Sequence, residues 1–239
     1  MTRIFSRRKR PVLEAMGQIF IFLSVVGAVL YGGGWYPEGL LWQLLTKASA
    51  VTFLALFVAV NIRTFGHALL FLALLASVSG DVLIAMPHEQ AFMRGLLGFM
   101  VAHVIFIVLY VTNRRPMKEI GTVPIRLASL LWVFAFVSGF ALNDMLGDMR
   151  MYVFTYTAVL TAMATAALLS KFPLRLTGIG AVLFIASDAA LGARQFIPSV
   201  PEYMGYFVWV TYYASELMMT MGVMLTDDRP TNFGGYRFD

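Results

Sequence analysis

The sequence divides into eight apolar runs of about 20 residues each, the length at which an α-helix spans the hydrocarbon core of a bilayer. Short segments that carry charges, Gly or Pro separate the runs. Only 13% of the 239 residues are charged, about half the share found in soluble domains, so the charges are too few to cover a soluble globule. We therefore expect an all-α, polytopic membrane protein, a bundle of eight transmembrane helices with short loops. The expected helices cover residues 13–31, 40–60, 66–86, 91–112, 122–142, 150–170, 174–193 and 203–225.

The distribution of Lys and Arg predicts the orientation of this bundle. With eight crossings, the N-terminal segment, every second connection and the C-terminal tail share one side of the membrane, and they carry fourteen of the 18 basic residues. The opposite side carries Arg94, Arg150 and Arg194, and Lys47 lies within the second run. Because cytoplasmic segments are enriched in Lys and Arg, we expect both termini in the cytosol, and in a bacterium this membrane is the inner (plasma) membrane.

One transmembrane helical domain, residues 13–225, is expected between a basic cytosolic N-terminus, residues 1–12, and a cytosolic C-terminal tail, residues 226–239. The basic segment before the first run is also a feature of signal peptides. However, "VLYGGGWYP" lacks a cleavage site of the A-x-A type, so we expect the first helix to be retained. Cleavage would leave seven helices with the same orientation.

The residue types that are present exclude several kinds of site. Cys is absent, which excludes disulfides, thiolate metal ligands and a cysteine nucleophile. Two of the three histidines, His67 and His88, fall at a membrane edge and in a loop on opposite sides, so a three-histidine zinc site is not expected. No G-x-S-x-G, H-E-x-x-H or Walker motif occurs, and the basic residues follow no nucleic-acid-binding motif. We expect no three-histidine or thiolate metal site and no nucleic-acid partner, and the sequence indicates no protein partner.

Five ionisable residues lie inside the predicted membrane spans: Lys47, Asp81, His103, Asp188 and Glu216. An ionised group at the centre of a bilayer costs on the order of 3 kcal/mol. At a rise of 1.5 Å per residue, the five lie about 7 to 20 Å from the outer ends of their helices. One cavity in the outer half of the bundle can therefore contain all five.

Each of these residues also has a purely structural interpretation. Asp81 and Asp188 can each pair with a buried base that fixes helix packing, and Lys47 can be a counter-ion rather than a substrate ligand. His103 can bridge two helices, and Glu216 can be protonated and hydrogen-bonded without a role in chemistry. The aromatic residues Tyr156, Trp209, Tyr212 and Tyr213 can likewise pack inside the bundle or lie at the membrane interface instead of contacting a ligand.

The segments around these positions resemble the YhhN family of lysoplasmalogenases. The resemblance rests on "LLTKASA", "SVSGDVLIAMP", "GLLGFMVAHVIFIVLY", the tyrosine at Tyr156, "GAVLFIASDAALGA" and "TYYASELMM", which together extend over nearly the whole chain. Two positions depart from the family pattern. Ala48 stands where the family usually has proline, and Glu216 stands where it tends to have glutamine.

The resemblance implies a cofactor-independent membrane hydrolase whose partner is a lysophospholipid within the bilayer. Such an enzyme cleaves the sn-1 vinyl ether bond of lysoplasmalogen and releases a fatty aldehyde and glycerophosphoethanolamine or glycerophosphocholine. The reaction begins with protonation of the β-carbon, which gives an oxocarbenium ion that water attacks. It needs a protonated acid and a carboxylate, and two buried carboxyl groups close together supply both forms, as in glycosidases.

We accordingly expect Asp81 and Asp188 to be the acid/base pair, in an order that the sequence leaves open. His103 is expected to orient a carboxyl group or relay protons, and Lys47 to hold the substrate phosphate or tune a carboxylate. The remaining expected substrate contacts are Tyr156, Tyr212, Tyr213 and Glu216.

Two other functions fit the same features. Intramembrane carboxylates can form the proton relay of a small-molecule or proton-coupled transporter, although no pair of clearly broken helices marks a midplane binding site. The chain can also be a lipid hydrolase or lipid-binding protein of different lysolipid specificity.

Overall fold

The computed structural model describes residues 11–226, and within this range all the helices and turns form one helical bundle without strands. Eight long helices follow one another as α1 (Pro11–Gly32), α2 (Leu40–Ala59), α3 (Phe65–Ala85), α4 (Ala91–Thr112), α5 (Thr122–Leu142), α6 (Arg150–Leu168), α7 (Ile179–Phe196) and α8 (Met204–Thr226). Short 3-10 turns occupy connections at Met117–Glu119, Asn143–Met145 and Gly147–Met149, and a π-helical turn, Leu174–Gly178, precedes α7. The predicted all-α class is confirmed.

The apolar runs and the helices differ by only a few residues at each end. The largest difference is at the start of α7, where the π-helical turn takes up the first five predicted residues and the α-helix begins at Ile179. At its C-terminal end the helix continues to Phe196 instead of ending at residue 193. It stops at Ile197, which has extended backbone angles (φ −110°, ψ 108°) and precedes Pro198. The proline ring disfavours helical geometry in the residue before it, which explains the stop. As a result, Arg194 belongs to the last turn of α7 and not to a loop.

Seven of the described helices, α1 to α7, are long and apolar enough to cross a membrane. The protein is therefore a multi-pass membrane protein. The 23 residues of α8 also suffice in length, but this helix contains hydroxyl side chains and Glu216 and is not among the seven that are apolar enough. That α8 crosses the membrane as the eighth helix stays a prediction.

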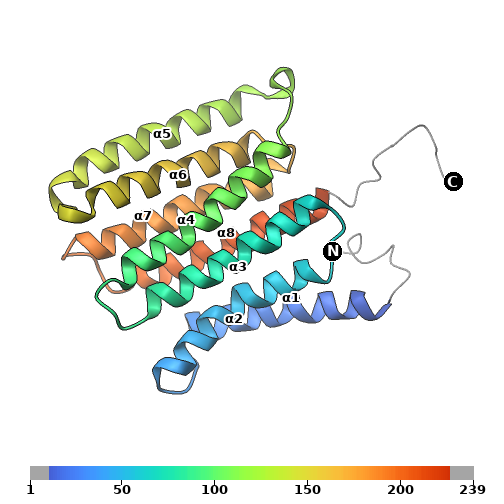
Figure 1. Cartoon of the computed structure of the whole chain (residues 1–239), viewed down its shortest axis with the longest axis horizontal. Helices are drawn as coiled ribbons and strands as arrows, with labels where there is room; N and C mark the ends of the chain where they lie inside the picture. The colour runs from blue at the N-terminus through green and yellow to red at the C-terminus, as the bar shows by residue number, and fades with distance from the viewer. Residues whose placement is uncertain (1–10, 227–239) are drawn as a thin grey trace.

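The first residue of α1 and the last residue of α8 lie at the same end of the bundle (Figure 1). This end carries the connections α2–α3, α4–α5 and α6–α7, and the other end carries α1–α2, α3–α4, α5–α6 and α7–α8. The predicted N-terminal and C-terminal segments, residues 1–12 and 226–239, lie outside the described residues except for Pro11, Val12 and Thr226, which are helical. The cytosolic position of both termini stays a prediction.

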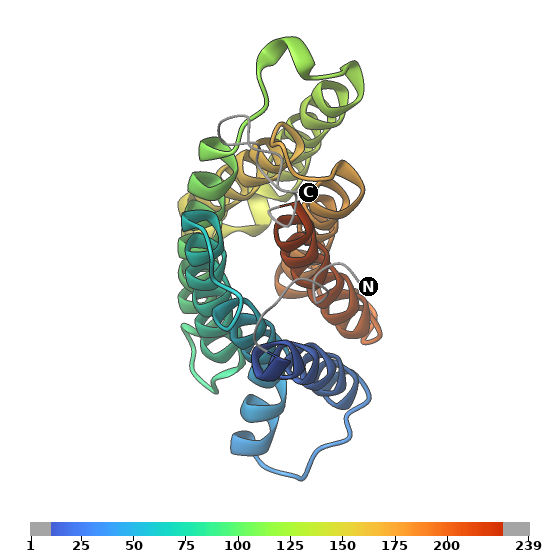
Figure 2. The ribbon, with the colours of Figure 1, turned by 90° about the vertical axis from the view of Figure 1, so that its right-hand side faces the viewer.

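Viewed along the helices, α3 and α4 lie opposite α7 and α8, with α1 and α2 on one flank and α5 and α6 on the other (Figure 2). Helix α5 is the outermost helix of its flank and packs mainly against α6 (Figure 1). Its buried residues are Pro124 and Ala128 alone, and it exposes large apolar side chains such as Phe136 and Phe140. Such a surface suits contact with lipid chains.

Glycine residues let α3 and α4 approach each other closely. A Cβ atom added to Gly98 would lie 2.8 Å from the Cα atom of Gly80, and one added to Gly80 would lie 2.9 Å from the ring of Phe99. Small residues allow such contacts in lipid, where packing rather than a hydrophobic driving force holds helices together. Since Asp81 follows Gly80, this contact also determines where Asp81 lies in the bundle.

Candidate active site

Asp81 lies near the C-terminal end of α3, and its side chain is only 2% exposed. Its Oδ1 atom forms an ion pair with Lys47 Nζ of α2 at 3.3 Å. The same ammonium group donates a hydrogen bond to the main-chain oxygen of Asp81. The Oδ2 atom accepts a 2.7 Å hydrogen bond from the hydroxyl group of Tyr212 in α8. Both carboxylate oxygens are thus bound by groups from other helices, which a buried charge requires.

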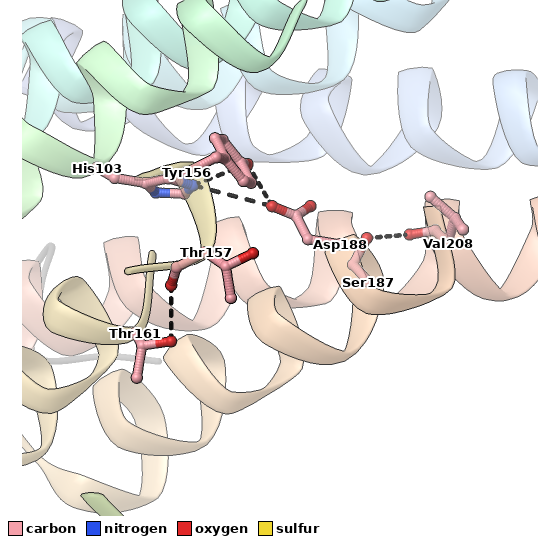
Figure 3. Close-up of polar contacts among 7 residues, drawn as sticks. All are labelled: His103, Tyr156, Thr157, Thr161, Ser187, Asp188 and Val208. Carbon is pink, nitrogen blue, oxygen red and sulfur yellow. Dashed lines mark hydrogen bonds and ion pairs between the residues drawn. The ribbon is translucent and has the colours of Figure 1, made fainter. Parts of the chain in front are cut away.

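Asp188 lies in the middle of α7 and accepts a hydrogen bond at Oδ2 from the hydroxyl group of Tyr156 in α6 (Figure 3). The Nε2 atom of His103, in α4, lies 3.1 Å from the Tyr156 oxygen and 3.9 Å from Asp188 Oδ2. A tyrosine hydroxyl has one proton, and Tyr156 donates it to Asp188, so His103 Nε2 is the donor to Tyr156. A hydrogen-bonded chain therefore runs from His103 through Tyr156 to Asp188.

The two aspartates differ in how many of their oxygens are occupied. Each accepts a hydrogen bond from a tyrosine, Asp81 from Tyr212 and Asp188 from Tyr156. Asp81 has Lys47 on its second oxygen, whereas Oδ1 of Asp188 makes no hydrogen bond or ion pair with any residue from 11 to 226. Asp188 is thus the aspartate with an oxygen available to a bound molecule.

A polar cavity of about 110 Å³ brings the two aspartates together. Residues from α1, α2, α3, α4, α7 and α8 line it, and it lies toward the end of the bundle opposite the termini. Besides Asp81, Asp188 and Lys47, its wall includes Tyr31, Phe99, Ser187, Arg194, Trp209 and Tyr212. Four of the residues predicted from the sequence therefore share one cavity.

A second, apolar cavity of about 190 Å³ also borders Asp188, and residues of α4, α5, α6 and α7 line it. Its wall is mostly aliphatic and aromatic, with Leu96, Phe134, Leu160 and Ile185 among its residues. Asp188 is the charged residue of this wall, and Tyr156 lies beside it. Asp188 thus borders a polar cavity and an apolar one at the same time.

Two predicted substrate contacts line neither cavity. The hydroxyl group of Tyr213 is 2.8 Å from the Ser24 hydroxyl of α1, and its ring stacks on Trp209, so it lies in the packing between α1 and α8. Glu216 lies one turn further along α8 from Tyr212, fully buried beside Ser77 of α3. Neither Glu216 carboxyl oxygen makes a hydrogen bond within the described part of the chain.

The polar cavity also contains Arg194, Ser187 and Tyr31, which the sequence does not predict as site residues. From the sequence, Arg194 is expected only as a charge outside the membrane, because the predicted helix ends one residue before it. Ser187 and Arg194 are seven residues apart, a spacing that places them on one face of a helix, and this was the available signal. Tyr31 carries no such signal, because aromatic residues near helix ends are common in membrane proteins.

The described residues contain no group of three or more His, Cys, Asp or Glu side chains that could hold a metal ion. The ionisable groups at the site are two aspartates, Lys47, Arg194, His103 and three tyrosines, Tyr31, Tyr156 and Tyr212. These groups can transfer protons and stabilise a developing charge in a partly apolar site.

Comparison with known proteins identifies relatives along most of the chain. The model of the YhhN family matches residues 42–223. A lysoplasmalogenase of Mycobacterium bovis is 30% identical over 214 residues, which cover 89% of this chain and 82% of the relative. The lysoplasmalogenase TMEM86B of Rattus norvegicus is 30% identical over 203 residues, which cover 84% and 82%. No solved structure is a significant match. The predicted family is confirmed, and the chain belongs to the YhhN family.

Proposed function

We propose that the protein is a membrane hydrolase that cleaves the sn-1 vinyl ether bond of a lysoplasmalogen. The observation that carries this proposal is the position of Asp188 between the polar cavity and the apolar cavity. In a lysoplasmalogen the vinyl ether joins an apolar chain to a polar glycerophosphate part. With the chain in the apolar cavity and the glycerol in the polar cavity, the scissile bond lies beside Asp188. The lysoplasmalogenase names of the relatives support the same activity.

Asp188 is the proposed proton donor. Its Oδ2 atom is held by Tyr156, and its Oδ1 atom is available to carry the proton toward the substrate. Transfer of this proton to the β-carbon of the vinyl ether uses the electron pair of the double bond to form the new C–H bond. The positive charge that results is shared by the α-carbon and the ether oxygen as an oxocarbenium ion.

Asp81 is the proposed carboxylate partner. Its ion pair with Lys47 and its hydrogen bond from Tyr212 hold a charged carboxylate in the wall of the same cavity. A fixed negative charge near a developing cation lowers the energy of the transition state. Of the two roles considered for Lys47, the geometry favours tuning of a carboxylate over binding of phosphate.

Water completes the reaction in this mechanism. It adds to the α-carbon of the oxocarbenium ion and gives up a proton to a carboxylate, which produces a hemiacetal. The hemiacetal then loses its hydroxyl proton, its bond to the glycerol oxygen breaks, and that oxygen takes up a proton. The products are a fatty aldehyde and a glycerophospho-headgroup, with one water consumed. His103 and Tyr156 orient Asp188 and return a proton to it.

Aldehyde release from purified protein in detergent tests this function. Lysolipids with the same chain and headgroup but with a vinyl ether, an alkyl ether or an acyl linkage are compared. We expect aldehyde from the vinyl ether alone, and strong losses in Asp81→Asn and Asp188→Asn. If both variants stay folded and retain near-wild-type rates, the mechanism is wrong. Solute or proton uptake into proteoliposomes without lipid turnover would instead support a transporter.

We also propose that both termini lie in the cytosol, in a bacterium on the inner face of the plasma membrane. In the described connections and the helix turns next to them, the end that holds the termini carries seven basic residues and the other end carries Arg94, Arg150 and Arg194. The absence of Cys allows a direct test with single cysteines. A membrane-impermeant maleimide should label Ser199→Cys in intact cells and should label Glu119→Cys only after the membrane is opened. The reverse result would contradict this orientation.

A further inference from the structure

We propose that Arg194 binds the phosphate group of the substrate and makes the protein select lysolipids with a phosphorylated headgroup. This role rests on the proposed function and adds to it a residue that recognises the headgroup. Arg194 lies in the last turn of α7 and lines the polar cavity together with Asp81 and Asp188. The side chain is exposed, and it lines the polar cavity but not the apolar one.

The charges in the cavity wall identify Arg194 as the cation that is available to bind phosphate. The cavity has two cations, Lys47 and Arg194, but Lys47 is already paired with Asp81. Asp188 begins each proposed cycle protonated and therefore neutral. The guanidinium group of Arg194 makes no hydrogen bond or ion pair with any other residue between 11 and 226. One positive charge is left for an anion, and a guanidinium group matches phosphate oxygens with two parallel hydrogen bonds.

Gly205, at the start of α8, provides the space in which this guanidinium group lies. A Cβ atom added to Gly205 would lie 3.0 Å from Arg194 Nη1 and 3.3 Å from its Cζ atom. The exposed arginine side chain therefore lies directly against α8 at Gly205. A larger residue at position 205 would move the guanidinium group without removing its charge.

The position of Arg194 along α7 agrees with the length of the substrate. Arg194 follows Asp188 by six residues, a rise of about 9 Å along the helix axis. In the substrate, the three glycerol carbons and the phosphoester oxygen separate the vinyl ether oxygen from phosphorus, and the hydrogen bond to guanidinium adds about 2.9 Å. A substrate whose vinyl ether lies at Asp188 can therefore place its phosphate at Arg194.

Two substrates with the same alkenyl chain separate headgroup recognition from catalysis: 1-alkenyl-lysophosphoethanolamine and 1-alkenylglycerol, which lacks phosphate. For Arg194→Gln we expect kcat/KM on the phosphorylated substrate to fall about tenfold to a hundredfold, the effect of losing a charge-assisted hydrogen bond. The loss should appear in KM. Activity on 1-alkenylglycerol should stay unchanged, and Arg194→Lys should be intermediate. Gly205→Ala should act in the same direction as Arg194→Gln.

Arg150→Gln is the matched control, because it removes an arginine at the same end of the bundle that lines neither cavity. It should leave both substrates unaffected. Equal losses of Arg194→Gln on both substrates would reveal a structural role only, and no loss on either would overturn the phosphate role as well.

A binding measurement keeps the two proposals separable. Wild-type protein and Arg194→Gln are titrated with an alkyl ether lysophosphoethanolamine, which binds without being cleaved by vinyl ether chemistry, and with the matching alkylglycerol. Weaker binding of the phosphorylated ligand alone supports the role of Arg194 even if wild-type protein releases no aldehyde. Equal binding by the two proteins overturns that role even if aldehyde is released.

Discussion

Lys47 and Asp81 form an ion pair between α2 and α3, with 3.3 Å between Nζ and Oδ1, in the wall of a cavity that also contains Asp188. The pair makes the two aspartates unequal, because Lys47 and Tyr212 occupy both oxygens of Asp81, whereas Oδ1 of Asp188 has no such partner among residues 11–226. This inequality is the basis for distinguishing a fixed carboxylate, Asp81, from a proton donor, Asp188.

Replacing Lys47 by Met should lower both stability and activity. The substitution leaves the buried Asp81 without its cation, which costs about 3 kcal/mol when one partner of a buried pair is removed. Adding Asp81→Asn removes the unpaired charge and should recover most of the stability but none of the activity. Thermal unfolding in detergent of the single and double variants gives the coupling energy. If the stability losses of the two single variants add up to the loss of the double variant, Lys47 and Asp81 are not energetically coupled.

Tyr156→Phe should lower kcat while leaving KM nearly unchanged. The change removes the hydroxyl group that links His103 to Asp188, so the carboxyl group loses its orienting donor. We expect a loss of about tenfold to a hundredfold, in the range for a hydrogen bond to a charged group. Steady-state kinetics on the vinyl ether substrate measures it.

The control for that variant is Tyr213→Phe. Its hydroxyl group is 2.8 Å from Ser24 and lies outside both cavities, so kcat should stay near the wild-type value. Only stability should fall, by about 1 kcal/mol. A drop in kcat as large as that of Tyr156→Phe would mean that general packing, and not the link to Asp188, explains both results.

Glu216→Gln should retain activity within about twofold, with stability equal to or above the wild-type value. Glu216 lines neither cavity, and its carboxyl oxygens make no hydrogen bonds in the described residues, so an amide of the same shape replaces it at little cost. Aldehyde release and thermal unfolding check both parts. A large loss of kcat without unfolding would return Glu216 to the site as a catalytic or substrate-binding group.

Gly192→Leu should shorten the chain that the protein accepts. Gly192 lines the apolar cavity, and a Cβ atom added there has nothing within 4 Å, so a larger side chain would extend into the cavity without backbone strain. KM for long-chain substrate should rise, whereas KM for a short-chain homologue should change little. Gly192→Ala, which occupies almost none of this space, is the control. Equal effects on both chain lengths would place the alkyl chain elsewhere.

The sequence predicted the helices well, because run length and apolarity decide which segments can cross a bilayer. The ends agree to within a few residues, and the largest error at a C-terminal end, at α7, arises from the position of Pro198. The free-energy cost of placing a charge in the bilayer also identified Asp81 and Asp188 as candidate site residues. That cost applies whichever way the residue's face of the helix points.

Contacts between helices could not be predicted in the same way. The hydrogen bonds from Tyr212 to Asp81 and from Tyr156 to Asp188 depend on the rotation of four helices about their axes. Nearly uniform apolarity leaves that rotation undetermined in the sequence. The same reason explains why Glu216 lies outside both cavities. Arg194 was not predicted for a different reason, because the predicted helix ended at residue 193 and the observed one continues to Phe196.

The most direct test of the account compares wild-type protein with Asp188→Asn on lysoplasmenylethanolamine, with aldehyde release as the measurement. Asparagine keeps the size of the side chain and an oxygen for the Tyr156 hydrogen bond, but it cannot donate the proton. The account predicts steady aldehyde release by the wild-type protein and, in a folded Asp188→Asn, a loss of at least about a hundredfold in kcat. Near-wild-type aldehyde release by folded Asp188→Asn would contradict it.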